Sequence, residues 1–208
     1  DTIVNLGLRN DTVVSLYRRL RRQHFDTPFD LAFVWVGVND VVRAPWASMS
    51  WTYRLAAMLV GKPRARDIEE FQMYYQNVLD LVALHTVHIV AVSPLFKGED
   101  LTNPWNRKLE SLGKLIEGLS ARDKRITYLD LRAIFAPKLA GRSLSAYLPT
   151  NPLGVVLDAL LLHTDVQIDR VAEARGLHYT LDGIHLNSMG AAIVAEMFGR
   201  VIEARRCF

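Results

Sequence analysis

The sequence of 208 residues has little cysteine, little net charge and no long hydrophobic run, and each shortage excludes a class of protein. A single cysteine, Cys207, excludes an internal disulfide and a cysteine-based zinc site. Lysine and arginine total 25 against 22 acidic residues, and this balance is too even to indicate a nucleic-acid partner. No stretch reaches the roughly 18 apolar residues of a membrane span, so we expect no transmembrane segment.

What is present is the composition of a folded globular protein. Hydrophobic residues make up 50% of the chain and charged residues 23%, which excludes an intrinsically disordered polypeptide. The chain contains no internal repeat, no low-complexity tract and no Gly/Ser-rich linker. The sequence therefore predicts a single domain over residues 1–208, with two long insertions at about 41–66 and 139–165.

Short β-branched runs alternate along the chain with longer stretches of helical period. The runs occupy residues 2–6, 31–36, 88–92 and 126–130, and the helical stripes occupy residues 13–20, 68–82, 105–119 and 193–202. Asp67 and Asn187 stand where the N-caps of the second and last helices are expected. Runs that are apolar without alternation are typical of strands buried on both faces. The pattern predicts an α/β fold with an open, mostly parallel, doubly wound sheet.

Ligand sites in such sheets lie beyond the carboxyl ends of the strands. Gly37 follows the second run and Asn39 comes two residues later; the side-chain amide of Asn39 is a suitable donor to a negative oxygen formed in acyl transfer. The turn near Asn10 offers backbone N–H groups with the same capacity. Before the last helix, His185 is a candidate general base that Asp182, three residues earlier, would orient.

These three segments resemble, in order, blocks II, III and V of the SGNH (GDSL-type) hydrolase family. The matching residues are Asn5-Leu-Gly7 with Asp11-Thr12, Gly37-Val-Asn39-Asp40 and Asp182-Gly-Ile-His185-Leu-Asn187. The resemblance implies a flavodoxin-like three-layer α/β/α sandwich and a serine esterase that needs no metal or cofactor. It also implies that Asn39 is the oxyanion-hole amide, His185 the base and Asp182 its partner, acting on a small-molecule or carbohydrate ester.

Two departures from the family pattern matter. The family's Gly-Asp-Ser block, which carries the nucleophilic serine, does not occur in these residues. Because the first apolar run begins at Thr2, we expect this block, the first strand and any export signal to precede Asp1, which leaves the compartment open. Asn10 stands where the family has an oxyanion glycine, but asparagine keeps the backbone N–H and tolerates a left-handed backbone.

Several alternatives stay open at this stage. Without the serine, the chain would be a catalytically silent binding or scaffolding module, and Asp40 with Asp182 and His185 would suit a metal-dependent hydrolase. Ser93 follows a strand but precedes a proline, which denies it the usual helix start.

The two insertions and one helix face also allow two interpretations each. Trp46, Trp51 and Tyr53 either line an acyl or sugar pocket beside Gly37 or pack in the core. The second insertion, around the apolar residues 153–162, either covers a site or adds core. Four arginines between residues 18 and 22 form either a solvated face or a contact for an anionic lipid or polymer. The sequence does not indicate an oligomeric state.

Overall fold

The computed structural model describes residues 2–42, 62–145, 147 and 162–206. The chain divides into two compact units. The first unit comprises Asp1–Pro94 with Lys108–Asp130, and the second comprises Leu95–Arg107 with Leu131–Phe208. The expectation of one domain over residues 1–208 stays a prediction. Trp46, Trp51, Tyr53 and residues 153–161 lie outside the described residues.

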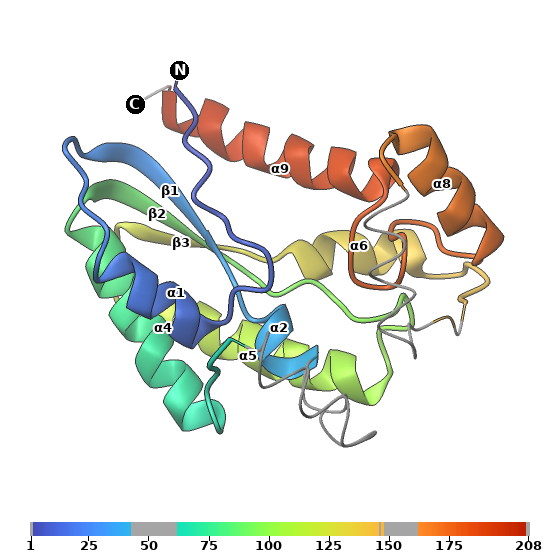
Figure 1. Ribbon diagram of the computed structural model, residues 1–208, viewed down its shortest axis with the longest axis horizontal. Coiled ribbons are helices and arrows are strands. Elements are labelled where there is room, and N and C mark those ends of the chain that lie inside the picture. Colours follow the sequence, from blue (N-terminus) through green and yellow to red (C-terminus); the bar gives the residue numbers. More distant parts are fainter. Residues whose placement is uncertain (1, 43–61, 146, 148–161, 207–208) are drawn as a thin grey trace. The chain divides into compact units, whose positions relative to one another are not determined.

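A parallel sheet of three strands forms the centre of the first unit (Figure 1). Its strands are β1 (Phe29–Trp35), β2 (Thr86–Val92) and β3 (Ile126–Leu129), in the order β1-β2-β3. Four successive residues of β2, from Ile89 to Val92, are at most 1% exposed, so the central strand is covered on both faces. The predicted α/β class with a parallel sheet is therefore confirmed. The run of this strand is apolar without alternation because both of its faces are buried.

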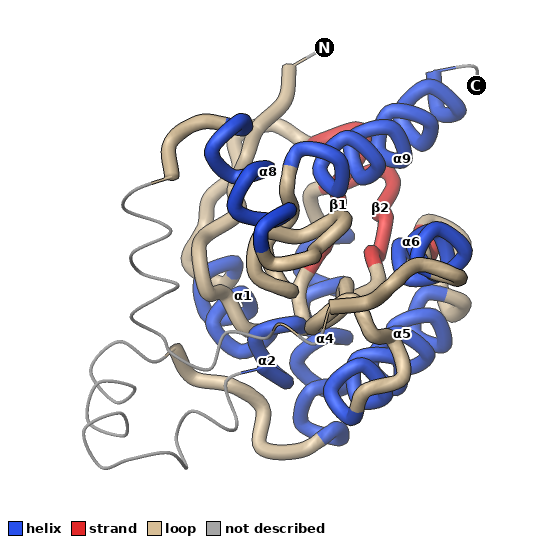
Figure 2. The backbone as a smooth tube through the Cα atoms, turned by 90° about the vertical axis from the view of Figure 1, so that its right-hand side faces the viewer, coloured by secondary structure: helices blue, strands red, loops and turns tan. Residues whose placement is uncertain are grey.

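Helices α1 (Val13–Leu20) and α4 (Ile68–Ala83) pack against each other, and α4 also packs against β2 (Figure 2). They share one hydrophobic core with α5 (Pro104–Ser120), of which the residues from Lys108 onward belong to this unit. Val13 of α1, Tyr75 of α4 and Ile116 of α5 are completely buried in that core. A short helix, α2 (Val38–Val42), follows β1 directly.

The helical stripes predicted from the sequence are confirmed as α1, α4, α5 and α9 (Ser188–Arg206). Both predicted N-caps are also confirmed. Oδ1 of Asp67 accepts a hydrogen bond from the Glu70 N–H at 2.8 Å, and Oδ1 of Asn187 accepts one from the Gly190 N–H at 3.0 Å. Each cap satisfies an amide that has no partner within its own helix.

The predicted strand at residues 2–6 is wrong, because this segment belongs to no strand of the structure. A strand requires a hydrogen-bonded neighbour, and among the described residues β1 pairs only with β2. The apolar side chains of the segment stay accessible, with Ile3 85% and Val4 52% exposed. Local β propensity is therefore present here without the pairing that would turn it into a strand.

The second unit has its own core, which is built around three aromatic rings. Phe96 and Phe135 meet edge to face with ring centroids 5.4 Å apart, and Phe135 meets Tyr179 in the same way at 5.4 Å. Its helices are α6 (Leu131–Leu139), α8 (Asp165–Ala174) and α9, and α8 packs against α9 (Figure 2). Within the described ranges, no helix is long and apolar enough to cross a membrane.

Candidate active site

A tight loop before α9 joins a buried carboxylate to an exposed imidazole. The Asp182 side chain is 2% exposed and that of His185 is 62% exposed. Oδ2 of Asp182 lies 2.8 Å from Nδ1 of His185. The other carboxylate oxygen, Oδ1, accepts hydrogen bonds from the N–H groups of Ile184 at 3.0 Å and His185 at 2.8 Å. The three-residue spacing thus places the imidazole and the carboxylate in one turn.

The environment of Asp182 keeps its carboxyl group ionised. Burial alone would raise its pKa, but the hydrogen bonds from the ring and the N–H groups of His185 and Ile184 outweigh burial and lower the pKa. An ionised carboxylate can only accept hydrogen bonds, so Nδ1 of His185 must carry the hydrogen. In the neutral form of the ring Nε2 is then the proton acceptor, which is the arrangement that general-base catalysis requires.

A second buried carboxylate, Glu99, fixes the chain that leads into this loop. Glu99 is completely buried, and its oxygens accept hydrogen bonds from the backbone N–H groups of His178, Tyr179 and Thr180 at 2.7–3.0 Å. The Thr180 hydroxyl also donates to Glu99, at 2.9 Å, and accepts from the Gly183 N–H at 3.2 Å. Glu99 therefore acts on the loop of Asp182 as a structural anchor.

The Asn106 side chain anchors the segment that carries Glu99 in the same way. Its side chain is completely buried, accepts a hydrogen bond from the Lys97 N–H at 2.8 Å and donates to the carbonyl oxygens of Gly98 and Asp100 at 3.0 and 2.7 Å. The Gly98 N–H in turn donates to the Gly183 carbonyl at 2.6 Å. Neither anchor was identified from the sequence, because glutamate and asparagine side chains are ordinarily exposed to solvent.

The first unit brings the two predicted oxyanion donors together. The side-chain Nδ2 of Asn39, on α2, donates to the backbone carbonyl of Asp11 at 3.0 Å. Asn10 immediately precedes Asp11 and adopts the left-handed conformation with φ of 59°, as expected for a residue that replaces glycine. Its N–H group makes no hydrogen bond within the described residues. An amide –NH₂ has two hydrogens, so Asn39 can hold the turn and still donate to a ligand.

Two further residues shape the start of α2. Gly37 has φ of 130°, and a β-carbon there would lie 2.9 Å from Cγ of Pro94, so the position requires glycine. Asp40 lies on α2, and its Oδ2 accepts a hydrogen bond from the Val13 N–H, at the first residue of α1, at 3.1 Å. Burial raises the pKa of Asp40 to about 7, against hydrogen bonds that lower it. Asp40 thus joins α2 to the start of α1.

The predicted site residues therefore fall into two groups, each with defined local geometry. Asp182 and His185 form a hydrogen-bonded pair in the second unit, whereas Asn39 and Asn10 adjoin in the first. Ser93 is completely buried. No cluster of three His, Cys, Asp or Glu side chains that could hold a metal ion occurs in the described parts of the chain.

The sequence profile of the GDSL-like lipase/acylhydrolase family matches residues 1–198. The chain belongs to this family. Membership supports ester hydrolysis as its class of activity, and it confirms the resemblance seen in the three sequence blocks. No curated protein sequence matches the chain.

Solved structures of SGNH-type esterases share the fold of this GDSL-like chain. A catalytic mutant of the acetylxylan esterase Axe2 from Geobacillus stearothermophilus is 16% identical, with a TM-score of 0.62 over 95% of this chain and 70% of that one. The acetyl xylan esterase AlAXEase is 20% identical, with a TM-score of 0.57 over 94% and 78%. LAE5, an α/β hydrolase from the metagenome of Lake Arreo, Spain, is 17% identical, with a TM-score of 0.56 over 95% and 69%.

Proposed function

We propose that this chain supplies the base and the oxyanion donors of a serine-type ester hydrolase that works through an acyl-enzyme. The observation that carries the proposal is the buried carboxylate of Asp182 bonded at 2.8 Å to Nδ1 of His185, whose ring is 62% exposed. A purely structural histidine would not need a desolvated anion at one nitrogen while most of its ring faces solvent.

In the proposed mechanism a serine hydroxyl attacks the ester carbonyl as Nε2 of His185 removes its proton. Asp182 holds the ring and stabilises the imidazolium that forms. The negative oxygen accepts hydrogen bonds from Nδ2 of Asn39 and the N–H of Asn10. His185 returns the proton to the leaving alcohol and then activates the water that releases the acyl group.

We place the nucleophilic serine in a segment that precedes Asp1. Two observations support this placement: no Gly-Asp-Ser occurs in the 208 residues, and Ser93, which follows β2, is completely buried. A further strand would also find a partner at β1, whose outer edge has no strand beside it among the described residues. Trp35 on that strand is 40% exposed.

For the substrate we propose an acyl or acetyl ester of a small molecule or a carbohydrate. Support comes from the neighbouring structures, two of which are named as acetylxylan esterases. Two of the Axe2 structures are catalytic mutants in which an aspartate and a histidine three positions later were replaced, the same spacing as Asp182 and His185. We place all of these roles in one SGNH-like domain over residues 1–208, to which Gly37, Trp46 and Trp51 would contribute the substrate pocket.

The test is labelling of the full-length protein with a fluorophosphonate probe, followed by mapping of the modified residue. We expect one modified serine, located before Asp1, and loss of labelling in the His185→Ala variant. His163→Ala is the matched control, because His163 is exposed. An unlabelled but folded full-length protein would favour the silent binding module, and a modified serine inside the 208 residues would contradict the upstream placement.

A further inference from the structure

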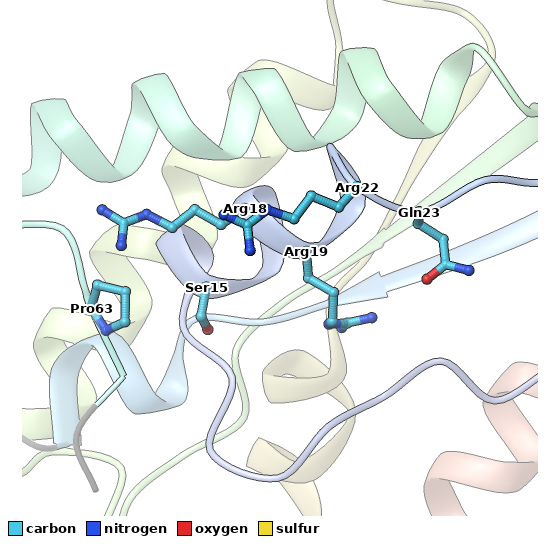
Figure 3. Close-up of a pocket in the computed structure, with 6 residues that line it drawn as sticks. All are labelled: Ser15, Arg18, Arg19, Arg22, Gln23 and Pro63. Carbon is cyan, nitrogen blue, oxygen red and sulfur yellow. The ribbon is translucent and has the colours of Figure 1, made fainter. Parts of the chain in front are cut away.

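An open pocket of about 400 Å³ lies against helix α1 in the first unit (Figure 3). It is lined by Ser15, Arg18, Arg19, Arg22, Gln23 and Pro63. Four of these residues follow the spacing i, i+3, i+4, i+7 that places side chains on one face of a helix. Three arginine side chains of this helix face thus line the pocket together with Pro63, which comes from a distant part of the sequence (Figure 3).

The acidic side chains of the described residues do not neutralise this pocket. Asp11 carries one negative charge and pairs with two cations, Arg19 at 2.7 Å and Lys62 at 2.5 Å. Burial raises the pKa of Asp11, but these cations and the Ser15 hydroxyl outweigh burial and lower the pKa. The negative charge of Asp11 is therefore already balanced by Arg19 and Lys62. Within the described part of the chain, neither Arg18 nor Arg22 has an ion-pair partner.

One hydrogen-bond donor of Arg19 has no acceptor among the described residues. Its Nη2 is bonded to Asp11, yet its Nε is buried and has no hydrogen-bond partner among the described residues. A buried donor without an acceptor is costly in the free protein. Arg18 and Arg22 are four residues apart and carry like charges, so they repel each other until an anion lies between them.

We propose that this pocket binds a phosphate-type oxyanion, either free or as the head of a small phosphorylated molecule. A tetrahedral dianion matches two unpaired guanidinium charges and can accept bidentate hydrogen bonds from their planar forks. A monocarboxylate would neutralise only one of those charges. The site is defined by residues of the first unit alone and does not rest on the proposed ester hydrolysis.

Arginine near the end of α1 has a structural use that the test must separate from ligand binding. Cations at a helix C-terminus interact favourably with the helix dipole, and all the arginines of this helix share that benefit. Replacement of Arg21 distinguishes helix stabilisation from ligand binding. It belongs to the same helix end but does not line the pocket, and its guanidinium lies 5.7 Å from the ring centre of Tyr17.

The experiment measures binding of inorganic phosphate and pyrophosphate to the full-length protein by titration calorimetry, with sodium chloride keeping the ionic strength constant. We expect saturable binding with one site per chain, and binding of acetate at least tenfold weaker. The double variant R18Q/R22Q should weaken phosphate binding at least tenfold, whereas R21Q should change it less than twofold. R18K/R22K keeps the charges but loses the forks, and we expect an intermediate loss.

Thermal unfolding of each variant is measured without ligand to check that it is folded. We expect unchanged unfolding midpoints, because the replaced side chains are exposed. Equal weakening by R21Q and R18Q/R22Q would overturn the proposal, because it would indicate a diffuse positive surface. Absence of saturable phosphate and pyrophosphate binding would overturn it as well. Vesicles of phosphatidylcholine with and without phosphatidic acid distinguish a lipid headgroup from a free anion. Vesicle association without soluble-anion binding would contradict a discrete pocket.

Discussion

The loop of Asp182 and His185 and the turn of Asn10 and Asp11 are held in place by opposite means. The loop rests on two completely buried polar side chains, Glu99 and Asn106, that accept hydrogen bonds from backbone N–H groups of the second unit. The turn rests on the partly exposed Asn39 amide and on ion pairs from Asp11 to two cations that are 23% and 29% exposed. One region is fixed by desolvated hydrogen bonds and the other by contacts that water and salt can reach.

This difference determines what a mutation in each region should cost. Buried hydrogen bonds to a charged group are expensive to break, so damage to the loop should be visible in the free energy of unfolding. Ion pairs that solvent reaches contribute about 0–1 kcal/mol each, and those of Asp11 are partly exposed, so damage to the turn should affect ligand and transition-state binding more than folding. The following substitutions test that contrast.

The largest effect is expected for His185→Ala in the full-length protein. Removing the proposed base should lower kcat by about 10⁴–10⁶-fold, because proton transfer from the nucleophile is lost. The unfolding midpoint should stay within error of the wild type, since the side chain is 62% exposed. Ester hydrolysis and thermal unfolding are measured in parallel, with His163→Ala as the control. Residual activity within tenfold of the wild type would remove His185 from the mechanism.

Asp40 makes the first unit sensitive to pH. Burial raises its pKa from 3.8 to about 7, so the folded protein holds this proton more tightly than the unfolded chain does. The contribution of Asp40 to stability is therefore present at pH 4, is lost as the pH rises to about 7, and is constant above that. Relative to Asp40→Asn, the wild-type free energy of unfolding should fall by up to about 4 kcal/mol across this interval.

The measurement is urea denaturation of wild type and Asp40→Asn at several pH values. The loop of the second unit should not contribute in the same interval. The pKa of Asp182 is lowered, so the stability that its ionised carboxylate gives is lost only as the pH falls below 3.8. If the free energy of unfolding depended on pH in the same way for both proteins, Asp40 would be charged over the whole interval and the prediction would be wrong.

Asn39→Ala should reduce kcat by about 10²–10³-fold if the amide stabilises the oxyanion. Stability should change little, because the substitution removes one hydrogen bond, to the Asp11 carbonyl, from a partly exposed site. Asn77→Ala on α4 is the matched control for an asparagine of similar exposure. Kinetics at saturating substrate decide the matter, since a change confined to KM would indicate substrate binding in place of oxyanion stabilisation.

Glu99→Gln should have the smallest effect on kcat and the clearest effect on folding. The amide retains one acceptor oxygen but turns a donor toward an N–H group, so we expect a loss of about 2–3 kcal/mol in the free energy of unfolding. Glu173→Gln, an exposed change in the same unit, is the control. Equal stability of the two variants, measured by urea denaturation, would show that buried hydrogen bonds do not hold the loop.

Much of the fold was predictable because its signals are local. The stripe of α4 and its cap at Asp67 can be read from neighbouring residues, and the structure confirms both. The segment at residues 2–6 has the same local signal for a strand, but pairing is decided by residues elsewhere in the chain. Helix α8 was missed although Thr164 and Gln167 form a capping box at its start.

The candidate site was predictable to the same extent. Asp182 and His185 are three residues apart, so their contact follows from a single turn. Glu99 lies about 80 residues from the amides that it anchors, and nothing in a Gly-Glu-Asp turn indicates burial. A buried carboxylate is recognisable only from the donors around it, which the tertiary structure supplies.

Among the described residues no strand lies beside the outer edge of β1, and this has a practical consequence for anyone who prepares these 208 residues. An unpaired strand edge with the exposed Trp35 on the same strand is a template to which a second copy can bind through main-chain hydrogen bonds. Protein made this way should precipitate or form higher-order species as its concentration rises.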